Sequence, residues 1–263
     1  MPSPDPPAPL PPDSDPWSAL RTLTAARIGL ARSGASLATA PLLEFRLAHA
    51  RARDAVLAPL DADALRADLT ALGLPVLMAA SAAQDRQQYL MRPDLGRQLT
   101  AEDESALATH TGAGHDLAFV IADGLSARAV AAHARPVLAE ALPRLAAEGW
   151  RIAPLVIVRQ GRVAIGDAVA LALRARMVAI LIGERPGLSA PDSMGIYLTW
   201  QPGPRTTDAN RNCISNIRPE GIDYAAAAGK VMHMLRMMRQ RQMSGIALKD
   251  DSDRPMIATD LSD

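Results

Sequence analysis

The sequence predicts an α/β protein with a Rossmann-like parallel sheet that carries helices on both faces, preceded by an α-rich N-terminal region. Three short apolar runs support this prediction, at 117–121, 152–158 and 177–182. Each run ends in a polar turn that contains glycine, and helical spacing follows the first two. Because the runs are apolar at successive positions, both sides of each strand are expected to be buried, as in a parallel sheet covered on both faces.

The chain divides into three predicted regions: 1–16, 17–110 and 111–263. The first reads MPSPDPPAPLPPDSDP, and its prolines remove backbone donors, so we expect a disordered tail. This tail is either an extension without a role or an address or docking peptide.

Residues 17–110 are predicted to be rich in helix. Apolar residues recur at helical spacing in 20–30 and again in 42–56, and Asp61 precedes a third helix at 62–72 as its N-cap. Short apolar runs between 76 and 91 flank a polar segment, which favours a small hairpin there.

Residues 111–263 are predicted to hold the sheet. After the first strand, Asp123 and Gly124 form a turn, and Ser126 caps a helix that Pro136 and Pro143 kink or break. A helix at 163–173 follows the second strand, and 197–200 is a candidate further strand. A closing helix is expected at 224–242, and its predicted core face comprises Ala227, Val231, Met234, Leu235 and Met238.

The composition excludes several classes of function. The 28 basic and 28 acidic residues balance, and there are only three Trp, three Tyr and two Phe, so a nucleic-acid-binding surface is not expected. The single cysteine, Cys213, excludes an internal disulfide and a cysteine-rich zinc site. No apolar run approaches the roughly 20 residues of a membrane span. We therefore expect a soluble, cytoplasmic protein.

The three turns at the strand ends are the prime candidates for a ligand site, since parallel sheets bind ligands beyond the carboxyl ends of their strands. The most informative turn is GERPG, in which an acidic residue, Glu184, is followed directly by a basic one, Arg185. These two residues are either part of a site or merely solvated surface charges. A second polar cluster, RNCISNIR, contains Cys213. Three roles are open for this cysteine: a nucleophile, a packing residue or a ligand contact. Packing is the default reading of this cysteine, because no acid or base partner is visible in the sequence.

Catalytic motifs are missing. The sequence has no phosphate loop of the G-x-x-x-x-G-K-[ST] type, no G-x-S-x-G elbow and no H-E-x-x-H pair, and its five histidines lack the spacing of a metal site. We therefore predict no metal ligand and no catalytic residue, and residue chemistry alone does not support a self-contained enzyme.

Several strings nevertheless resemble one family. The segments VRQGRVAIGDAV, ILIGERPGLSAPDSMG, RNCISNIRPEG and RQMSGIALKD are similar to the small (light) subunit of ethanolamine ammonia-lyase, and YLMRPDLGRQL and VIADGLSARAV resemble the same family. Together they span most of the chain from Tyr89 to Asp250 in order, which makes the resemblance specific.

The resemblance implies a carbon–nitrogen lyase that uses adenosylcobalamin to convert ethanolamine to acetaldehyde and ammonia. The implied enzyme is active only as a hetero-oligomer with a large subunit, with six copies of each chain. In that family the large subunit is a TIM-type barrel that holds the substrate and the catalytic side chains. The small subunit closes over the corrinoid at the interface, and the cofactor supplies the radical chemistry.

Carried over by motif, the cofactor-binding positions are Val163, Glu184 and Cys213. Val163 would contact the corrin edge, Glu184 would accept hydrogen bonds from cofactor amides, and Cys213 would be a small contact without nucleophilic chemistry. Arg162 and Arg185 are neighbours within reach of polar cofactor groups. The D-x-H-x-x-G string that supplies a histidine to cobalt elsewhere is missing, which suits a cofactor that retains its own base.

The sequence is also compatible with two other functions. The chain could instead be a non-catalytic subunit that binds or recruits cobalamin for another complex, or a free-standing small-molecule hydrolase, although the missing nucleophile and base pairs weigh against the latter. Some relatives carry a longer N-terminal extension linked to packaging in a bacterial microcompartment. Because this chain has only the proline-rich segment, a location inside such a compartment is an open expectation.

Overall fold

The computed structural model describes residues 17–250, so the predicted tail at 1–16 lies outside the described residues. The main elements, in chain order, are α1 (Ser18–Arg21), β1 (Arg32–Ser33), β2 (Ser36–Leu37), α2 (Thr39–Leu57), α3 (Ala62–Thr70), β3 (Val76–Ala80), α4 (Arg86–Met91), η2 (Leu95–Arg97), α5 (Ala101–Ala108), β4 (His115–Ala122), α6 (Ala127–Ala147), β5 (Leu155–Arg159), α7 (Ile165–Ala172), β6 (Ala175–Gly183), β7 (Met194–Trp200), η3 (Asp208–Asn210), β8 (Arg211–Ile217), α8 (Tyr224–Arg241) and η4 (Gly245–Ala247).

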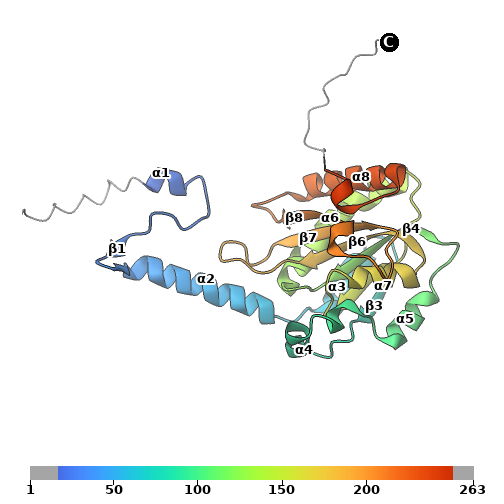
Figure 1. Ribbon diagram of the computed structural model, residues 1–263, viewed down its shortest axis with the longest axis horizontal. Helices are drawn as coiled ribbons and strands as arrows, with labels where there is room; N and C mark the ends of the chain where they lie inside the picture. Colours follow the sequence, from blue (N-terminus) through green and yellow to red (C-terminus); the bar gives the residue numbers. More distant parts are fainter. Residues whose placement is uncertain (1–16, 251–263) are drawn as a thin grey trace, which may run out of the picture.

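A six-stranded sheet in the order β3-β5-β4-β6-β7-β8 forms the centre of the molecule (Figure 1). The first four strands in this order are parallel, which confirms the predicted α/β fold and the three predicted strands. The sheet is nevertheless mixed, because β7 pairs antiparallel with β6 and β8 pairs antiparallel with β7. The prediction of a wholly parallel sheet was therefore wrong at one edge, where a short connection replaces a crossover helix.

Both faces of the sheet are buried, as the apolar runs predicted. Alternate residues of β4, such as Leu117 and Phe119, pack with α3, α6 and α8 on one face. The residues between them, such as Ala118 and Val120, pack with α5 and α7 on the other. The predicted core face of α8 is confirmed, since all five of its residues are buried.

Local capping explains several helix starts. The side chain of Asp61 accepts a hydrogen bond from the Ala64 amide at 3.0 Å, and that of Ser126 accepts one from the Ala129 amide at 3.4 Å, as the sequence predicted. The helix that follows Ser126 continues without a break through Pro136 and Pro143.

Two predictions for the N-terminal region were wrong. The segment 76–91 is not a hairpin, because β3 pairs in parallel with the distant β5 and Asp85 caps α4 through the Gln88 amide. In the stretch 20–30 only Leu20 and Arg21 are helical, as the end of α1, and Gly29 adopts a left-handed φ of 55° that is incompatible with a continuous helix across the stretch. The second stretch is the long helix α2, as predicted. The division of the chain at residue 110 stays a prediction, although β3 belongs to the sheet.

Figure 1 shows α2 projecting away from the body of the molecule, with α1, β1 and β2 at its far end. Within residues 17–250, no helix is long and apolar enough to cross a membrane.

Candidate functional site

An open cavity of about 430 Å³ lies at the carboxyl ends of the parallel strands. It is lined by Tyr89, Gly124, Leu125, Arg162, Val163, Ile182, Gly183, Glu184, Arg185 and Tyr197. The turns after β4, β5 and β6 all contribute to it, although they lie far apart in the sequence. The structure thus brings together the three strand-end turns that the sequence selected, at the edge where parallel sheets bind ligands.

Glycines allow two of these turns to touch. A Cβ atom on Gly183 would lie 2.0 Å from the carbonyl oxygen of Ser126, and one on Gly124 would lie 2.4 Å from that of Gly183. Gly124 also has a φ of 56°, which L-residues with a side chain rarely adopt. The close backbone approach between the β4 and β6 turns therefore requires glycine on both sides.

Asp123, which precedes the cavity-lining Gly124, holds the β4 and β5 turns together. Its buried carboxylate accepts hydrogen bonds from the backbone amides of Gln160 at 3.0 Å and Gly161 at 3.1 Å. Burial raises the pKa of Asp123, whereas the Gln160 amide and the nearby Arg86 guanidinium oppose this shift. The carboxylate fixes the main chain just before Arg162 and Val163, so it acts on the site through the backbone.

Glu184 is a half-buried carboxylate at the end of β6. It accepts a hydrogen bond from the Ser193 hydroxyl. Its two oxygens also share a longer hydrogen bond from the backbone amide of Asn216, with N···O distances of 3.3 and 3.4 Å. Gly195 makes room for it, because a Cβ there would lie 2.9 Å from Glu184 Oε1. Since a carboxylate has about four acceptor positions, Glu184 retains capacity to accept hydrogen bonds from a ligand in the cavity.

Cys213 lies beside the cavity rather than in its lining. It pairs with Tyr197 in the β7–β8 register, and the side chains of these two residues are close enough to shift each other's pKa. Cys213 is exposed by surface area, but the surrounding strands partly desolvate its thiol, and this desolvation raises its pKa. The neighbouring Tyr197 hydroxyl opposes this shift, and the negative charge of Glu184 raises the pKa further. Such surroundings keep the thiol protonated, which is the opposite of what a nucleophilic cysteine requires.

We therefore expect Cys213 to alkylate slowly. In a pH series with iodoacetamide, the rate should rise to half its maximum at a higher pH than for free cysteine, because the folded protein favours the neutral thiol. A midpoint below that of free cysteine would show an activated thiolate and contradict this interpretation.

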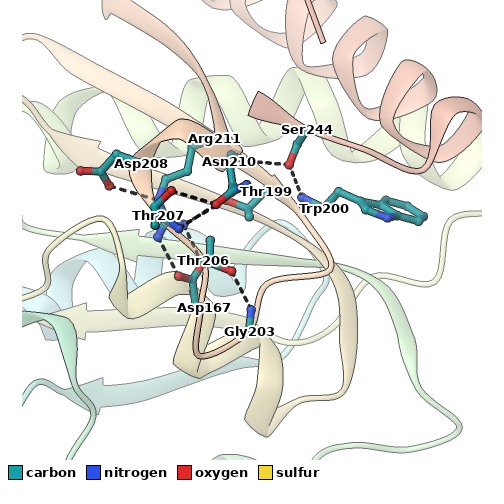
Figure 2. Close-up of polar contacts among 10 residues, drawn as sticks. All are labelled: Asp167, Thr199, Trp200, Gly203, Thr206, Thr207, Asp208, Asn210, Arg211 and Ser244. Carbon is teal, nitrogen blue, oxygen red and sulfur yellow. Dashed lines mark hydrogen bonds and ion pairs between the residues drawn. The ribbon is translucent and has the colours of Figure 1, made fainter. Parts of the chain in front are cut away.

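A buried ion pair fixes the strand that carries Cys213. Figure 2 shows Arg211, the first residue of β8, reaching Asp167 on α7. Its two terminal nitrogens each donate to a different Asp167 oxygen at 2.7 Å, and Nη1 also donates to the Thr199 hydroxyl at 3.1 Å. The ion pair links β8 to α7, the helix that starts just after Val163. It therefore fixes the position of Cys213 relative to that of Val163.

Three residues at or beside the cavity were not predicted as site residues from the sequence: Tyr89, Tyr197 and Arg86. Tyr89 is buried, and the guanidinium carbons of Arg162 and Arg86 lie 4.1 and 4.7 Å from the centroid of its ring. Tyr197 joins Cys213 to the cavity lining. The string YLMRPDLGRQL marked the neighbourhood of Tyr89, but only the fold shows that this string lies beside the β5 turn.

Among residues 17–250 there is no group of three or more His, Cys, Asp or Glu side chains placed to hold a metal ion. The fold and the cavity define an α/β protein with an open cavity at the carboxyl edge of its sheet. The family model for the ethanolamine ammonia-lyase light chain (EutC) matches residues 14–249. The chain therefore belongs to the ethanolamine ammonia-lyase light chain family, whose name describes a lyase.

Relatives with the same description are similar over nearly the whole chain. The chain is 54% identical over 246 residues to the ethanolamine ammonia-lyase small subunit of Ralstonia nicotianae, covering 92% of this chain and 91% of the relative. It is 54% identical over 247 residues to that of Azotobacter vinelandii, with 92% and 91% coverage. It is 53% identical over 255 residues to that of Xanthomonas campestris pv. campestris, with 96% and 94% coverage.

Proposed function

We propose that this chain is the small subunit of an adenosylcobalamin-dependent ethanolamine ammonia-lyase, which converts ethanolamine to acetaldehyde and ammonia together with a large subunit. The observation that carries the proposal is the cavity itself. It brings Val163 and Glu184, which are distant in the sequence, into one lining, and Cys213 adjoins it through Tyr197. These are the positions at which the family resemblance places cofactor contacts.

The residues of the cavity suit a corrinoid, which combines an apolar ring edge with peripheral amides. Val163 offers an apolar contact, and Glu184 offers acceptors to amide N–H groups. Arg162 contributes a buried Nε atom that has no hydrogen-bond partner in the described part of the chain. Buried donors of this kind are normally satisfied, so a ligand acceptor is expected here.

Size supports a shared site. A cavity of about 430 Å³ lies within the range for drug-sized ligands, and adenosylcobalamin is much larger. This chain would therefore enclose only part of the cofactor, and the large subunit would cover the rest. When bound, adenosylcobalamin supplies a radical by homolysis of its cobalt–carbon bond. The role of this chain is to bind and orient the cofactor and to exclude water from it.

The region 17–57 has the character of a contact surface for the large subunit. Its exposed apolar side chains include Leu43, Phe45 and Leu47, and it contains six arginines but only two acidic residues. It is joined to the loop that follows Arg185, because Arg27 donates to the Leu188 carbonyl at 3.4 Å and Ser189 donates to that of Ala25 at 3.3 Å. A partner with an acidic and apolar surface would therefore cover this region and the cavity mouth together.

Reconstitution tests the proposal. The two subunits, co-expressed and purified as one complex, should release ammonia from ethanolamine only when adenosylcobalamin is added, and each subunit alone should be inactive. Full activity of the large subunit alone would contradict it. If the complex binds cobalamin but this chain does not change the turnover rate of the large subunit, the chain would instead be a non-catalytic subunit that recruits the cofactor. The copy number in the complex and the location in the cell stay predictions.

A further inference from the structure

Arg162 lines the cavity with a guanidinium group that the protein satisfies only in part. Its Nη2 donates to the Tyr89 carbonyl oxygen at 2.9 Å. Its Nε is buried without a partner, and within residues 17–250 Nη1 donates no hydrogen bond and the guanidinium forms no ion pair with a carboxylate. A buried charged donor without an acceptor is costly, so this arrangement indicates an acceptor that the chain itself does not provide.

The guanidinium is held in place before any ligand arrives. It stacks on the Tyr89 ring at 4.1 Å, and the Arg162 amide donates to the Gly96 carbonyl at 2.7 Å. Gly96 also makes room for the side chain, because a Cβ there would lie 2.7 Å from Arg162 Cγ. The Tyr89 hydroxyl donates to the Gly161 carbonyl at 3.3 Å. A side chain fixed in this way loses little further conformational entropy when it binds.

The charges around the cavity favour an anion at Arg162. Arg86, the other arginine on the Tyr89 ring, is 4.0 Å from the buried Asp123 carboxylate and donates to the Gly124 carbonyl at 2.8 Å. Its Nη2 is also buried without a hydrogen-bond partner in the described residues, but the Asp123 carboxylate balances its charge within the protein. Glu184 is engaged by Ser193 and Asn216 at the β6 turn. Arg162 is thus the cavity arginine whose charge the described residues leave unbalanced and whose position is fixed.

We propose that Arg162 binds the phosphodiester of the nucleotide loop of the corrinoid, with Tyr89 as the residue that positions it. This inference rests on the proposed function, since it assigns one part of the cofactor to one side chain. The peripheral amides of a corrinoid are neutral, whereas the phosphodiester is the anionic group that links the lower base to the ring. Guanidinium binds such oxygens with charge-assisted hydrogen bonds.

The test compares two corrinoids, cobalamin and cobinamide, which lacks the nucleotide loop and its phosphate. Binding to the purified two-subunit complex is measured by equilibrium dialysis and by the absorption spectrum of the corrin. The R162M variant should bind cobalamin about ten- to a hundredfold more weakly than the unchanged complex, the loss expected for a hydrogen bond to a charged group. Its affinity for cobinamide should stay within about twofold, because that ligand lacks the contact.

Three comparisons make the result decisive. R159M removes an exposed arginine at the end of β5 that does not line the cavity, and it should leave the preference for cobalamin unchanged. R162K keeps the charge but not the planar fork, and it should lose less affinity than R162M. If R162M does not fold, R162K is compared with the unchanged complex using cobinamide and cobinamide phosphate, and its preference for the phosphorylated ligand should be weaker.

Equal losses for cobalamin and cobinamide in R162M would overturn the inference and leave Arg162 as a residue that shapes the cavity. A loss of the cobalamin preference in R159M would overturn it as well, because an arginine outside the cavity would then have the same effect. If the unchanged complex binds neither corrinoid, the proposed function itself fails, which is a different outcome.

Discussion

The Glu184→Ala variant of the two-subunit complex is expected to bind adenosylcobalamin about ten- to a hundredfold more weakly, which is the range for losing hydrogen bonds to a charged group. Glu184 lies at the cavity end of β6, and Ser193 and Asn216 orient its carboxylate. Alanine removes the acceptor that we propose for the cofactor amides, and it also removes the hydrogen bonds that tie the start of the following loop to Ser193 and Asn216. Equilibrium dialysis of the cofactor against the purified complex measures the change.

The Glu184→Gln variant is the matched control. An amide of the same shape keeps one acceptor oxygen and fills the space beside Gly195, but it loses the negative charge. We expect this variant to bind the cofactor more tightly than the alanine variant and more weakly than the unchanged complex. Both variants should assemble with the large subunit as judged by size-exclusion chromatography. Unchanged cofactor affinity in the alanine variant would remove Glu184 from the site.

The sequence predicted the parts of the fold that depend on local patterns. The runs that became β4, β5 and β6 are apolar at successive positions and end in glycine-containing turns, so both their burial and their carboxyl ends could be read directly. The caps Asp61 and Ser126 were visible for the same reason, because a cap depends on residues only three positions away.

Predictions that required distant pairing failed. The strand β3 was interpreted as half of a hairpin, since nothing near it in the sequence shows that its partner is β5, with Val76 opposite Leu155. The sequence RNCISNI did not predict a strand because most of its residues are polar. This composition reflects the position of β8 at the edge of the sheet, where only Arg211, Ile214 and Ile217 are buried. Antiparallel pairing at that edge was therefore missed.

The candidate site shows the same division. Val163 and Glu184 follow strand ends. Both the family resemblance and the tendency of parallel sheets to bind ligands beyond the carboxyl ends of their strands therefore pointed to these positions. Tyr89 reaches the cavity from α4, which precedes β4 in the chain, and Tyr197 becomes a neighbour of Cys213 only through the β7–β8 register. Such neighbours are set by the packing of whole elements, and a single sequence contains no local signal for them.

The Asp167→Ala variant is expected to lose about 3–5 kcal/mol of unfolding free energy, because it leaves a buried arginine without its partner. The side chain of Arg211 is 2% exposed and that of Asp167 is 11% exposed, so water has little access to the arginine that the variant leaves behind. For a domain of this size the melting temperature should fall by about 6–20 °C, measured by thermal denaturation of the isolated chain.

Two controls separate the buried pair from the surrounding polar network. Asp208, 90% exposed, also pairs with Arg211, at 3.4 Å, so Asp208→Ala should cost less than about 1 kcal/mol. The double variant D167L/R211M replaces both charges with apolar groups and should recover most of the stability that Asp167→Ala loses, since the cost lies in the unpaired charge rather than in the missing attraction. If D167L/R211M is as unstable as Asp167→Ala, the hydrogen bond from Arg211 to Thr199 and the local packing, rather than charge pairing, hold β8 against α7.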